Sequence, residues 1–397
     1  MDSSVALLTS IATILFLIYW RKNVTLAVFT GAILLGLLTL GLKEFLILKK
    51  TLLALETLRL LIIITSAFTL GFSMQELGLL KELCQAVEGL CGKFSIVLLP
   101  ALVGFLPMPG GALVSAIMIK DLVSRHGLSP HQATFVNYWA RHVWIPVWPL
   151  YPSFILGASI VGVHYLTFIK AGVLISLPMI LFGGLFMREL FNFSIQRGKT
   201  FFHLKTAVFS FYPVLLVILF ALVLKIPLYI TLPTTVLVLF LHKRPDTEKL
   251  KKVLAKTLDW EILFLIIGVL FYKELISTTG AAHAFFVHLR QAHIPTSLAS
   301  FTLAFVIGLA VGIEVGLAAI VLPLLLSFTG IGAGFNPIHF ALVFAGGFMG
   351  IMLSPLHLCL VLTARYYNAS LSRVYSRLIP VSLLVMLSAW LVFLIKP

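Results

Sequence analysis

Two adjacent basic residues, Arg141 and His142, lie in the middle of the apolar stretch "NYWARHVWIPVWPLYP". A helix that starts near Pro130 would place them roughly ten residues along, about 15 Å from its start. A charge so deep in an apolar segment is unfavourable unless it faces a cavity or a partner. The Arg141 guanidinium could bind an anionic group, with two hydrogen bonds to a carboxylate. A permanent ion pair, most plausibly with Glu314, and snorkelling to an interface are the structural alternatives.

Glu314 and His357 are two further ionisable side chains at interruptions of apolar segments. Glu314 stands in "VGIEVG", where it could carry a coupling proton, help to bind a cation or neutralise Arg141. His357 follows the break at Ser354-Pro355 and could donate to a substrate or titrate near neutral pH. As a lone histidine near a helix end, it could equally cap backbone carbonyls.

Small and polar residues near the same breaks complete two candidate sites. The substrate-binding set is Gly110, Gly111, Ser115, Asn137, Arg141, His142, Ser354, His357 and Thr363, and the coupling-ion set is Glu314, Gly316, Pro149 and Pro355. Each hydroxyl or amide alone is more often satisfied within its own surroundings than used as a ligand. We expect no metal site and no cofactor beyond a coupling ion, because the cysteines Cys84, Cys91 and Cys359 form no CxxC pair.

The composition decides what kind of protein carries these residues. Of 397 residues, 60% are hydrophobic and only 11% are charged, whereas soluble domains hold about 25% charged residues. The chain is therefore expected to be an integral membrane protein without a separate soluble domain. Its net charge of +15 is explained by Lys and Arg in cytoplasmic loops, so we expect no nucleic-acid partner.

Apolar segments of membrane-spanning length recur along the whole sequence, in the same order in both halves. The first half contains expected spans near 5–20, 24–42 and 59–77, an interfacial stretch at 79–92, a hairpin-sized segment at 94–123, a broken helix at 131–163 and a span at 165–187. The second half contains spans near 204–224, 226–242 and 260–276, an interfacial stretch at 281–290, a hairpin-sized segment at 298–328, a broken helix at 337–366 and a span at 372–395.

The hairpin-sized segments have an unusual length. About 30 residues exceed one crossing and fall short of two, and the motif "FLPMPGGALVSA" places two prolines and two glycines at the middle of the first. We therefore predict two re-entrant hairpins. Irregular backbone survives in lipid only where it lines a cavity or is buried in protein. Such breaks expose helix N-termini that suit a carboxylate, and carbonyls that suit Na⁺.

Five crossings and one hairpin in each half would invert the second half relative to the first. This order predicts two inverted-topology repeats, residues 1–195 and 196–397, as in many secondary transporters. With ten crossings, most Lys and Arg residues fall on one side of the membrane. That side is predicted to be cytoplasmic, with both termini outside.

Three motifs, "FLPMPGGALVSA", "NYWARHVWIPVWPLYP" and "SPLHLCLVLTARYY", resemble an uncharacterised family of prokaryotic membrane proteins, the domain-of-unknown-function family 401. The resemblance covers nearly the whole chain. The family is grouped with the ion-transporter superfamily, which includes gluconate, citrate, C4-dicarboxylate and arsenite carriers. The resemblance implies an elevator-type fold with a scaffold and a moving transport domain, Na⁺ or H⁺ coupling, and often a homodimer.

The expected function is secondary active transport, by symport, of a small anion, most plausibly an organic carboxylate, across the cytoplasmic (inner) membrane. The main alternative is a cation/proton antiporter of the same superfamily, although cation sites usually contain more intramembrane carboxylates. An enzyme is not expected, because no HExxH motif or paired aspartates occur and Ser354 with His357 is weak support for a catalytic pair. A channel would more normally form its pore by oligomer symmetry than from inverted repeats.

Overall fold

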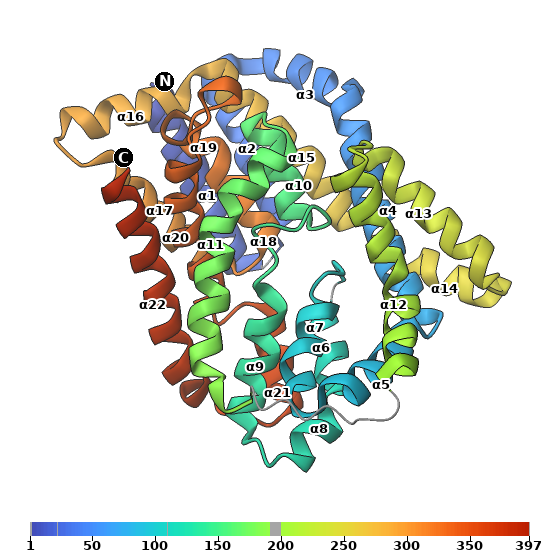
Figure 1. Cartoon of the computed structure of the whole chain (residues 1–397). Coiled ribbons are helices and arrows are strands. Elements are labelled where there is room, and N and C mark those ends of the chain that lie inside the picture. Colours follow the sequence, from blue (N-terminus) through green and yellow to red (C-terminus); the bar gives the residue numbers. More distant parts are fainter. Residues whose placement is uncertain (1, 22, 109, 191–199, 397) are drawn as a thin grey trace.

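The computed structural model describes residues 2–21, 23–108, 110–190 and 200–396 (Figure 1). Within these ranges every regular element is a helix and no strand occurs. The expected all-helical class is therefore confirmed for the part of the chain that the structure describes.

The helices follow the two halves of the sequence. Those of the first half are α1 (Ser3–Arg21), α2 (Val24–Leu40), α3 (Glu44–Leu53), α4 (Leu55–Glu76), α5 (Leu79–Cys91), α6 (Ser95–Val103), α7 (Gly111–Met118), α8 (Lys120–Arg125), α9 (Pro130–His142), α10 (Pro152–Val161) and α11 (Tyr165–Phe186). Those of the second half are α12 (Thr200–Val217), the π-helical turn η4 (Ile218–Val223), α13 (Leu228–Lys243), α14 (Thr247–Thr257), α15 (Trp260–Thr279), α16 (Ala281–Gln291), α17 (Thr296–Val311), α18 (Glu314–Gly316), the π-helical turn η5 (Leu317–Val321), α19 (Leu322–Thr329), α20 (Pro337–Leu353), α21 (Leu358–Tyr366) and α22 (Leu371–Ile395). Short 3₁₀ turns are η1 (Gly41–Lys43), η2 (Gly92–Phe94), η3 (Arg188–Leu190) and η6 (Gly332–Gly334).

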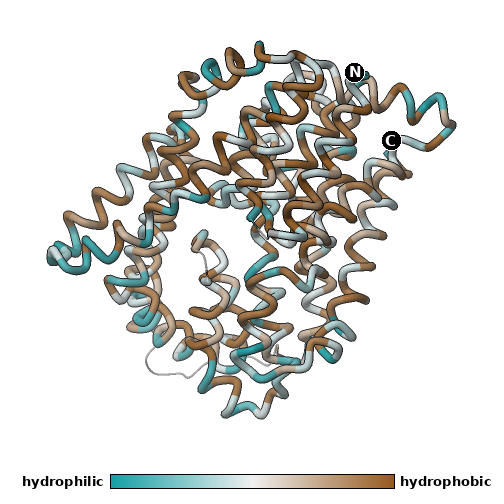
Figure 2. Tube along the Cα trace, turned by 180° about the vertical axis from the view of Figure 1, so that it is seen from behind, coloured by the Kyte–Doolittle hydropathy of each residue, from teal (hydrophilic) through white to brown (hydrophobic). Residues whose placement is uncertain are grey.

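Eight helical segments in the described ranges are long and apolar enough to cross a membrane. They are Ser3–Trp20, Val24–Leu53, Leu55–Glu76, Leu79–Val103, Tyr165–Phe186, Phe202–Val223, Pro337–Tyr366 and Leu371–Ile395. Hydrophobic residues cover most of the tube in Figure 2, and many large apolar side chains are exposed on the outside. Lipid would cover these side chains, so the chain is a multi-pass membrane protein.

Eight segments are fewer than the ten crossings that the sequence predicts. The expected crossings at 131–163, 226–242 and 260–276 are not among the eight, whereas Leu79–Val103 is. The expected crossing at 131–163 consists of two helices, α9 and α10, separated by the non-helical segment 143–151. Neither helix alone is long enough to cross a membrane. The amphipathic stretches 79–92 and 281–290 form α5 and α16.

The helix stops at each of the four places where the sequence predicts a break. Residues 104–110 separate α6 from α7, and residues 312–313 separate α17 from α18. The segments 143–151 and 354–357 interrupt the two longer elements, α9–α10 and α20–α21. Glycines stand where the chain turns with positive φ, at Gly110 (φ 73°) and Gly312 (φ 67°), a conformation that side chains with a Cβ disfavour.

The broken elements of the two halves pack against each other. In the lower part of Figure 1, α7 and α9 contact α21; above them, α10 contacts the helical stretch from α18 to α19. The helices α17 and α20 pack closely at Gly308, where a Cβ would lie 2.1 Å from the Gly347 carbonyl oxygen. All four breaks are thereby gathered in one region of the molecule.

Candidate functional site

One cavity of about 360 Å³ lies where the breaks meet. Its wall includes Gly110, the N-cap of α7, and the first residues of α10, α18 and α21. The first turns of α2 and α15 and Phe68 of α4 complete the wall. Of the predicted site residues, the cavity is lined by Gly110, Arg141, His142, Glu314 and His357.

Arg141 sits in the last turn of α9 with only 3% of its surface exposed. Its Nη1 donates to the Val103 carbonyl at 3.0 Å and its Nη2 to the Leu106 carbonyl at 3.2 Å. The ion pair with Glu314, one of the alternatives from the sequence, is not formed among the described residues: Oε1 of Glu314 lies 3.6 Å from Nε2 of His142 instead. The guanidinium is held by the carboxyl end of α6, and three of its five N–H groups are free of these two bonds.

Every carbonyl from residue 103 to residue 106 accepts a hydrogen bond from a side chain. Besides the two bonds of Arg141, the Tyr151 hydroxyl donates to Gly104 at 2.6 Å and the Trp148 indole N–H donates to Phe105 at 2.7 Å. The Val103 carbonyl belongs to the last turn of α6, and the other three lie in the non-helical segment that follows it. Trp148 therefore helps to close the break between α6 and α7.

The break between α20 and α21, at residues 354–357, is closed in a similar way. The Tyr138 hydroxyl donates to the Met352 carbonyl at 3.1 Å, and the Tyr375 hydroxyl donates to the Leu353 carbonyl at 3.0 Å. Both carbonyls belong to the last turn of α20. Side chains thus occupy the carboxyl ends of α6 and α20.

His142, His357 and Glu314 form a chain of ionisable groups in the cavity. The Nδ1 atom of His142 lies 2.6 Å from the Tyr138 carbonyl oxygen. A carbonyl only accepts, so this nitrogen carries a proton and Nε2 faces the cavity. That Nε2 lies 3.2 Å from Nε2 of His357 and 3.6 Å from Oε1 of Glu314.

Of three further predicted substrate residues, which are all buried, Asn137 and Thr363 form a polar bridge between helices. Asn137 donates to the Ala112 carbonyl at 2.9 Å and to the Thr363 hydroxyl at 3.2 Å, which joins α9 to α7 and α21. The Thr363 hydroxyl donates to the Cys359 carbonyl at 2.7 Å. Ser115 donates within its own helix. None of these three side chains is part of the cavity wall.

The other predicted residues lie at the breaks but outside the wall. The Ser354 hydroxyl accepts from the Leu356 N–H at 3.2 Å, and Gly316 packs on Val311. Pro149 and Pro355 lie in the non-helical segments 143–151 and 354–357. Gly111 begins α7 directly against Arg141, because a Cβ there would lie 2.2 Å from Nη2.

Several residues of the wall were missed by the sequence reasoning. Cys359 lies in the first turn of α21, two residues after His357, and Tyr151 precedes α10. Asp259 and Glu261 at the start of α15 also line the cavity. The motif "SPLHLC" contained the signal for Cys359, but a search for CxxC pairs does not detect a cysteine two residues after a histidine.

The sequence profile of the family described as "Protein of unknown function (DUF401)" matches residues 1–396. The chain therefore belongs to this family, as its three motifs predicted. None of the curated proteins matches the chain.

A solved structure is similar over nearly the whole chain. The crystal structure of the Alcanivorax borkumensis YdaH transporter, described as having an unusual topology, matches with a TM-score of 0.60 and 14% sequence identity. The match covers 96% of this chain and 97% of that one. At this identity the likeness concerns the fold, so the chain shares the fold of a membrane transporter.

Proposed function

We propose that this protein is a secondary active transporter that moves a small organic anion across the cytoplasmic membrane, coupled to Na⁺ or H⁺. The observation that carries the proposal is which backbone groups at the breaks already have partners. The carbonyls at the C-terminal ends of α6 and α20 accept hydrogen bonds from protein side chains. The helix N-termini that face the cavity, in contrast, have no side-chain cap.

Three uncapped N-termini, those of α7, α10 and α21, begin at the cavity wall. A helix N-terminus carries about half a positive charge and free N–H groups. The guanidinium of Arg141 adds a full charge in the same cavity. The N-terminus of α18 differs, because Glu314 places its own carboxylate there. This arrangement supports a carboxylate ligand at Arg141 and a coupling ion at Glu314.

The size of the cavity supports a small ligand. Ligand sites span about 300–1,000 Å³, and this cavity of about 360 Å³ lies at the lower end. With apolar residues such as Phe68 and Leu265 also in the wall, the substrate we propose is a carboxylate with a short carbon chain.

We further propose that residues 1–195 and 196–397 are inverted repeats that build this site together. In this proposal α6–α7 and α17–α19 are re-entrant hairpins from opposite sides, and α9–α10 and α20–α21 are the broken helices. They would move as a transport domain against a scaffold, in a homodimer. The mutual packing of the four broken elements supports this assignment. Both termini would then lie outside the cytoplasm.

Cysteine labelling tests the first hairpin. Lys93 and Lys120 flank it on either side, so single cysteines at these positions, in a background without native cysteines, should label from the cytoplasmic side. Labelling from opposite sides would mean that the segment crosses the membrane once, and the inverted-repeat assignment would fail.

A cation/proton antiporter is the second candidate. Glu314 beside His142 favours it, as do Asp259 and Glu261 in the same wall. The Oδ1 atom of Asp259, however, already accepts two backbone N–H groups at the start of α15. This oxygen is therefore less available to a coupling cation.

A transport assay separates the two candidates. Purified protein is first screened against organic anions by thermal shift, with and without Na⁺, and is then reconstituted in liposomes. We expect a labelled carboxylate from this screen to accumulate when a Na⁺ or H⁺ gradient is imposed. Cation exchange without any anion uptake would favour the antiporter and refute the anion proposal.

Variants of Arg141 test its part in recognition. Loss of a charge-assisted hydrogen bond, about 1.5–3 kcal/mol, should weaken anion binding by roughly 10- to 150-fold in Arg141→Gln. Arg141→Lys should restore little, because an ammonium lacks the planar fork. Arg377→Gln is the matched control, since Arg377 also donates to a carbonyl, that of Phe186, but lies outside this cavity. A folded Arg141→Gln protein with the parent's affinity would make Arg141 purely structural.

A further inference from the structure

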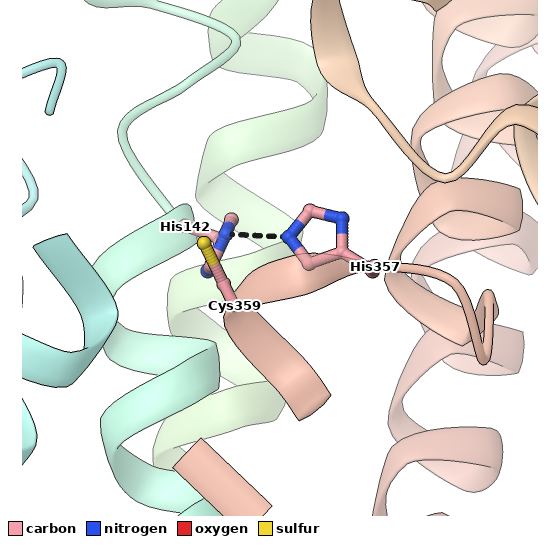
Figure 3. A group of neighbouring side chains, drawn as sticks. All are labelled: His142, His357 and Cys359. Carbon is pink, nitrogen blue, oxygen red and sulfur yellow. Dashed lines mark hydrogen bonds between the residues drawn. The ribbon is translucent and has the colours of Figure 1, made fainter. Parts of the chain in front are cut away.

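We infer that His142, His357 and Cys359 form a binding site for a divalent transition-metal ion of the zinc type. One ligand atom from each residue lies within 4.8 Å of the other two. Figure 3 shows the three side chains converging from the end of α9, the residue before α21 and the first turn of α21. The inference concerns the cavity of the proposed function, but it rests on ligand geometry and not on transport.

The spacing of the two imidazoles is close to that of a metal site. Bonds of about 2.0–2.3 Å in a tetrahedral zinc site place neighbouring ligand atoms roughly 3.3–3.8 Å apart. The two Nε2 atoms are 3.2 Å apart, slightly closer than this range. The Cys359 sulfur lies within 4.8 Å of a ring nitrogen of each histidine, so it has to approach by at most roughly 1 Å to complete such a site.

The tautomer of His142 is the one that a metal requires. Metal-binding histidines usually donate their second ring N–H to a carboxylate, a carbonyl or water, which fixes the ring and leaves the other nitrogen free. His142 Nδ1 makes this bond to the Tyr138 carbonyl at 2.6 Å, so its Nε2 directs a lone pair toward His357. His357 is also unlike a histidine held for structural reasons. Its Nε2 contacts His142, and its Nδ1 has no hydrogen-bond partner among the described residues.

Cys359 would bind the metal as a thiolate, with the metal ion taking the place of the thiol proton. The charge of this thiolate and the Glu314 carboxylate, which lines the same cavity, would offset the repulsion between Arg141 and a bound cation.

The ligand types select the class of metal. Two imidazoles and a thiolate suit Zn²⁺ and related ions, whereas Na⁺, Mg²⁺ and Ca²⁺ prefer oxygen ligands. Three protein ligands leave a fourth position open toward the cavity, where Glu314 Oε1 lies 3.6 Å from His142 Nε2. The sequence expectation of no metal site relied on CxxC spacing, which a site assembled from α9 and α21 does not need.

Cobalt titration of the purified full-length protein in detergent tests the inference. We expect one Co²⁺ per chain with a sulfur-to-cobalt charge-transfer band, and displacement of Co²⁺ by Zn²⁺. Cys359→Ser should abolish the band, while a Cys84→Ser/Cys91→Ser variant should keep it. His357→Gln should weaken Co²⁺ binding at least about tenfold, by the loss of one ligand of three.

Two results would overturn the inference. One is a folded parent protein that binds neither Co²⁺ nor Zn²⁺. The other is Co²⁺ binding without the charge-transfer band or unchanged in Cys359→Ser, which would mean adventitious binding by surface histidines. Because no transport is measured, failure here leaves the anion proposal standing, and failure of anion uptake leaves the metal inference standing.

Discussion

A single methyl group at Gly111 should displace the guanidinium of Arg141. A Cβ built on Gly111 lies 2.2 Å from Nη2, 2.7 Å from Cζ and 3.0 Å from Nη1 of Arg141. All three distances are shorter than an ordinary contact, so the guanidinium has to retreat by roughly 1 Å to reach van der Waals separation. It cannot do so freely, because the Val103 and Leu106 carbonyls hold it.

The magnitude follows from these two bonds. They are 3.0 and 3.2 Å long, and a shift of about 1 Å takes a hydrogen bond out of its useful range. A hydrogen bond to a charged group contributes about 1.5–3 kcal/mol. An alanine in a helix is otherwise favoured over glycine by up to about 1 kcal/mol. We therefore expect Gly111→Ala to lower the free energy of unfolding by about 2–5 kcal/mol, the loss of both bonds less the gain from alanine.

A double-mutant cycle isolates the clash as the cause. Unfolding of the purified protein in mixed detergent is measured for the parent, Gly111→Ala, Arg141→Ala and the double variant. Without the guanidinium the methyl group has room, so Gly111→Ala should be neutral or slightly stabilising in the Arg141→Ala background. Gly334→Ala is the matched control, because no atom lies within 4 Å of its added Cβ and its φ is not in the positive range.

Two outcomes would refute this reasoning. Gly111→Ala could unfold like the parent, in which case the guanidinium does not lie against the start of α7. It could also have the same effect with and without Arg141, in which case the backbone of Gly111 matters and the arginine does not.

Three further changes have expected outcomes in the same unfolding assay. Gly308→Ala pushes a Cβ to 2.1 Å from the Gly347 carbonyl, so α17 and α20 must separate, and we expect failure to fold or a loss of at least about 3 kcal/mol; near-parent stability would contradict this packing. Trp148→Phe keeps an aromatic ring but leaves the Phe105 carbonyl without its donor, which should cost about 1–3 kcal/mol; no loss would mean that water replaces the indole. Asn137→Ala removes two hydrogen bonds between α7, α9 and α21 and should cost about 1–3 kcal/mol; an unchanged midpoint would show that packing alone joins these helices.

The positions of the helix breaks were predictable from the sequence. Proline and glycine act on their own backbone, so their effect does not depend on distant partners. The start of α9 illustrates this: Pro130 occupies its first position, and Ser129 and Gln132 form a capping box. Gly110 and Gly312 likewise stand at turns of positive φ.

The partner of Arg141 was not predictable in this way. Sequence reasoning named Glu314, an intramembrane acid, as its possible protein partner, because charges are visible in a sequence and free backbone carbonyls are not. Every segment offers carbonyls, and only the end of a helix leaves them free. The fold brings the carboxyl end of α6 to Arg141 and leaves Glu314 with His142.

Whether the cavity favours an anion or a cation could not be predicted from the sequence either, because this also depends on which side chains the fold brings to the helix ends. Each helix break exposes carbonyls on one side and N–H groups on the other, so from the sequence the breaks fit Na⁺ as well as a carboxylate. The choice is made by side chains that come from elsewhere in the chain: Trp148 and Tyr151 for α6, Tyr138 and Tyr375 for α20. Because these donors occupy the carbonyls, a cation entering from the cavity would have to compete with them, whereas the uncapped N-termini of α7 and α21 remain available to an anion. A tryptophan or tyrosine beside a helix break can thus donate a hydrogen bond to a carbonyl at the helix end. Its hydrophobicity alone does not reveal this role.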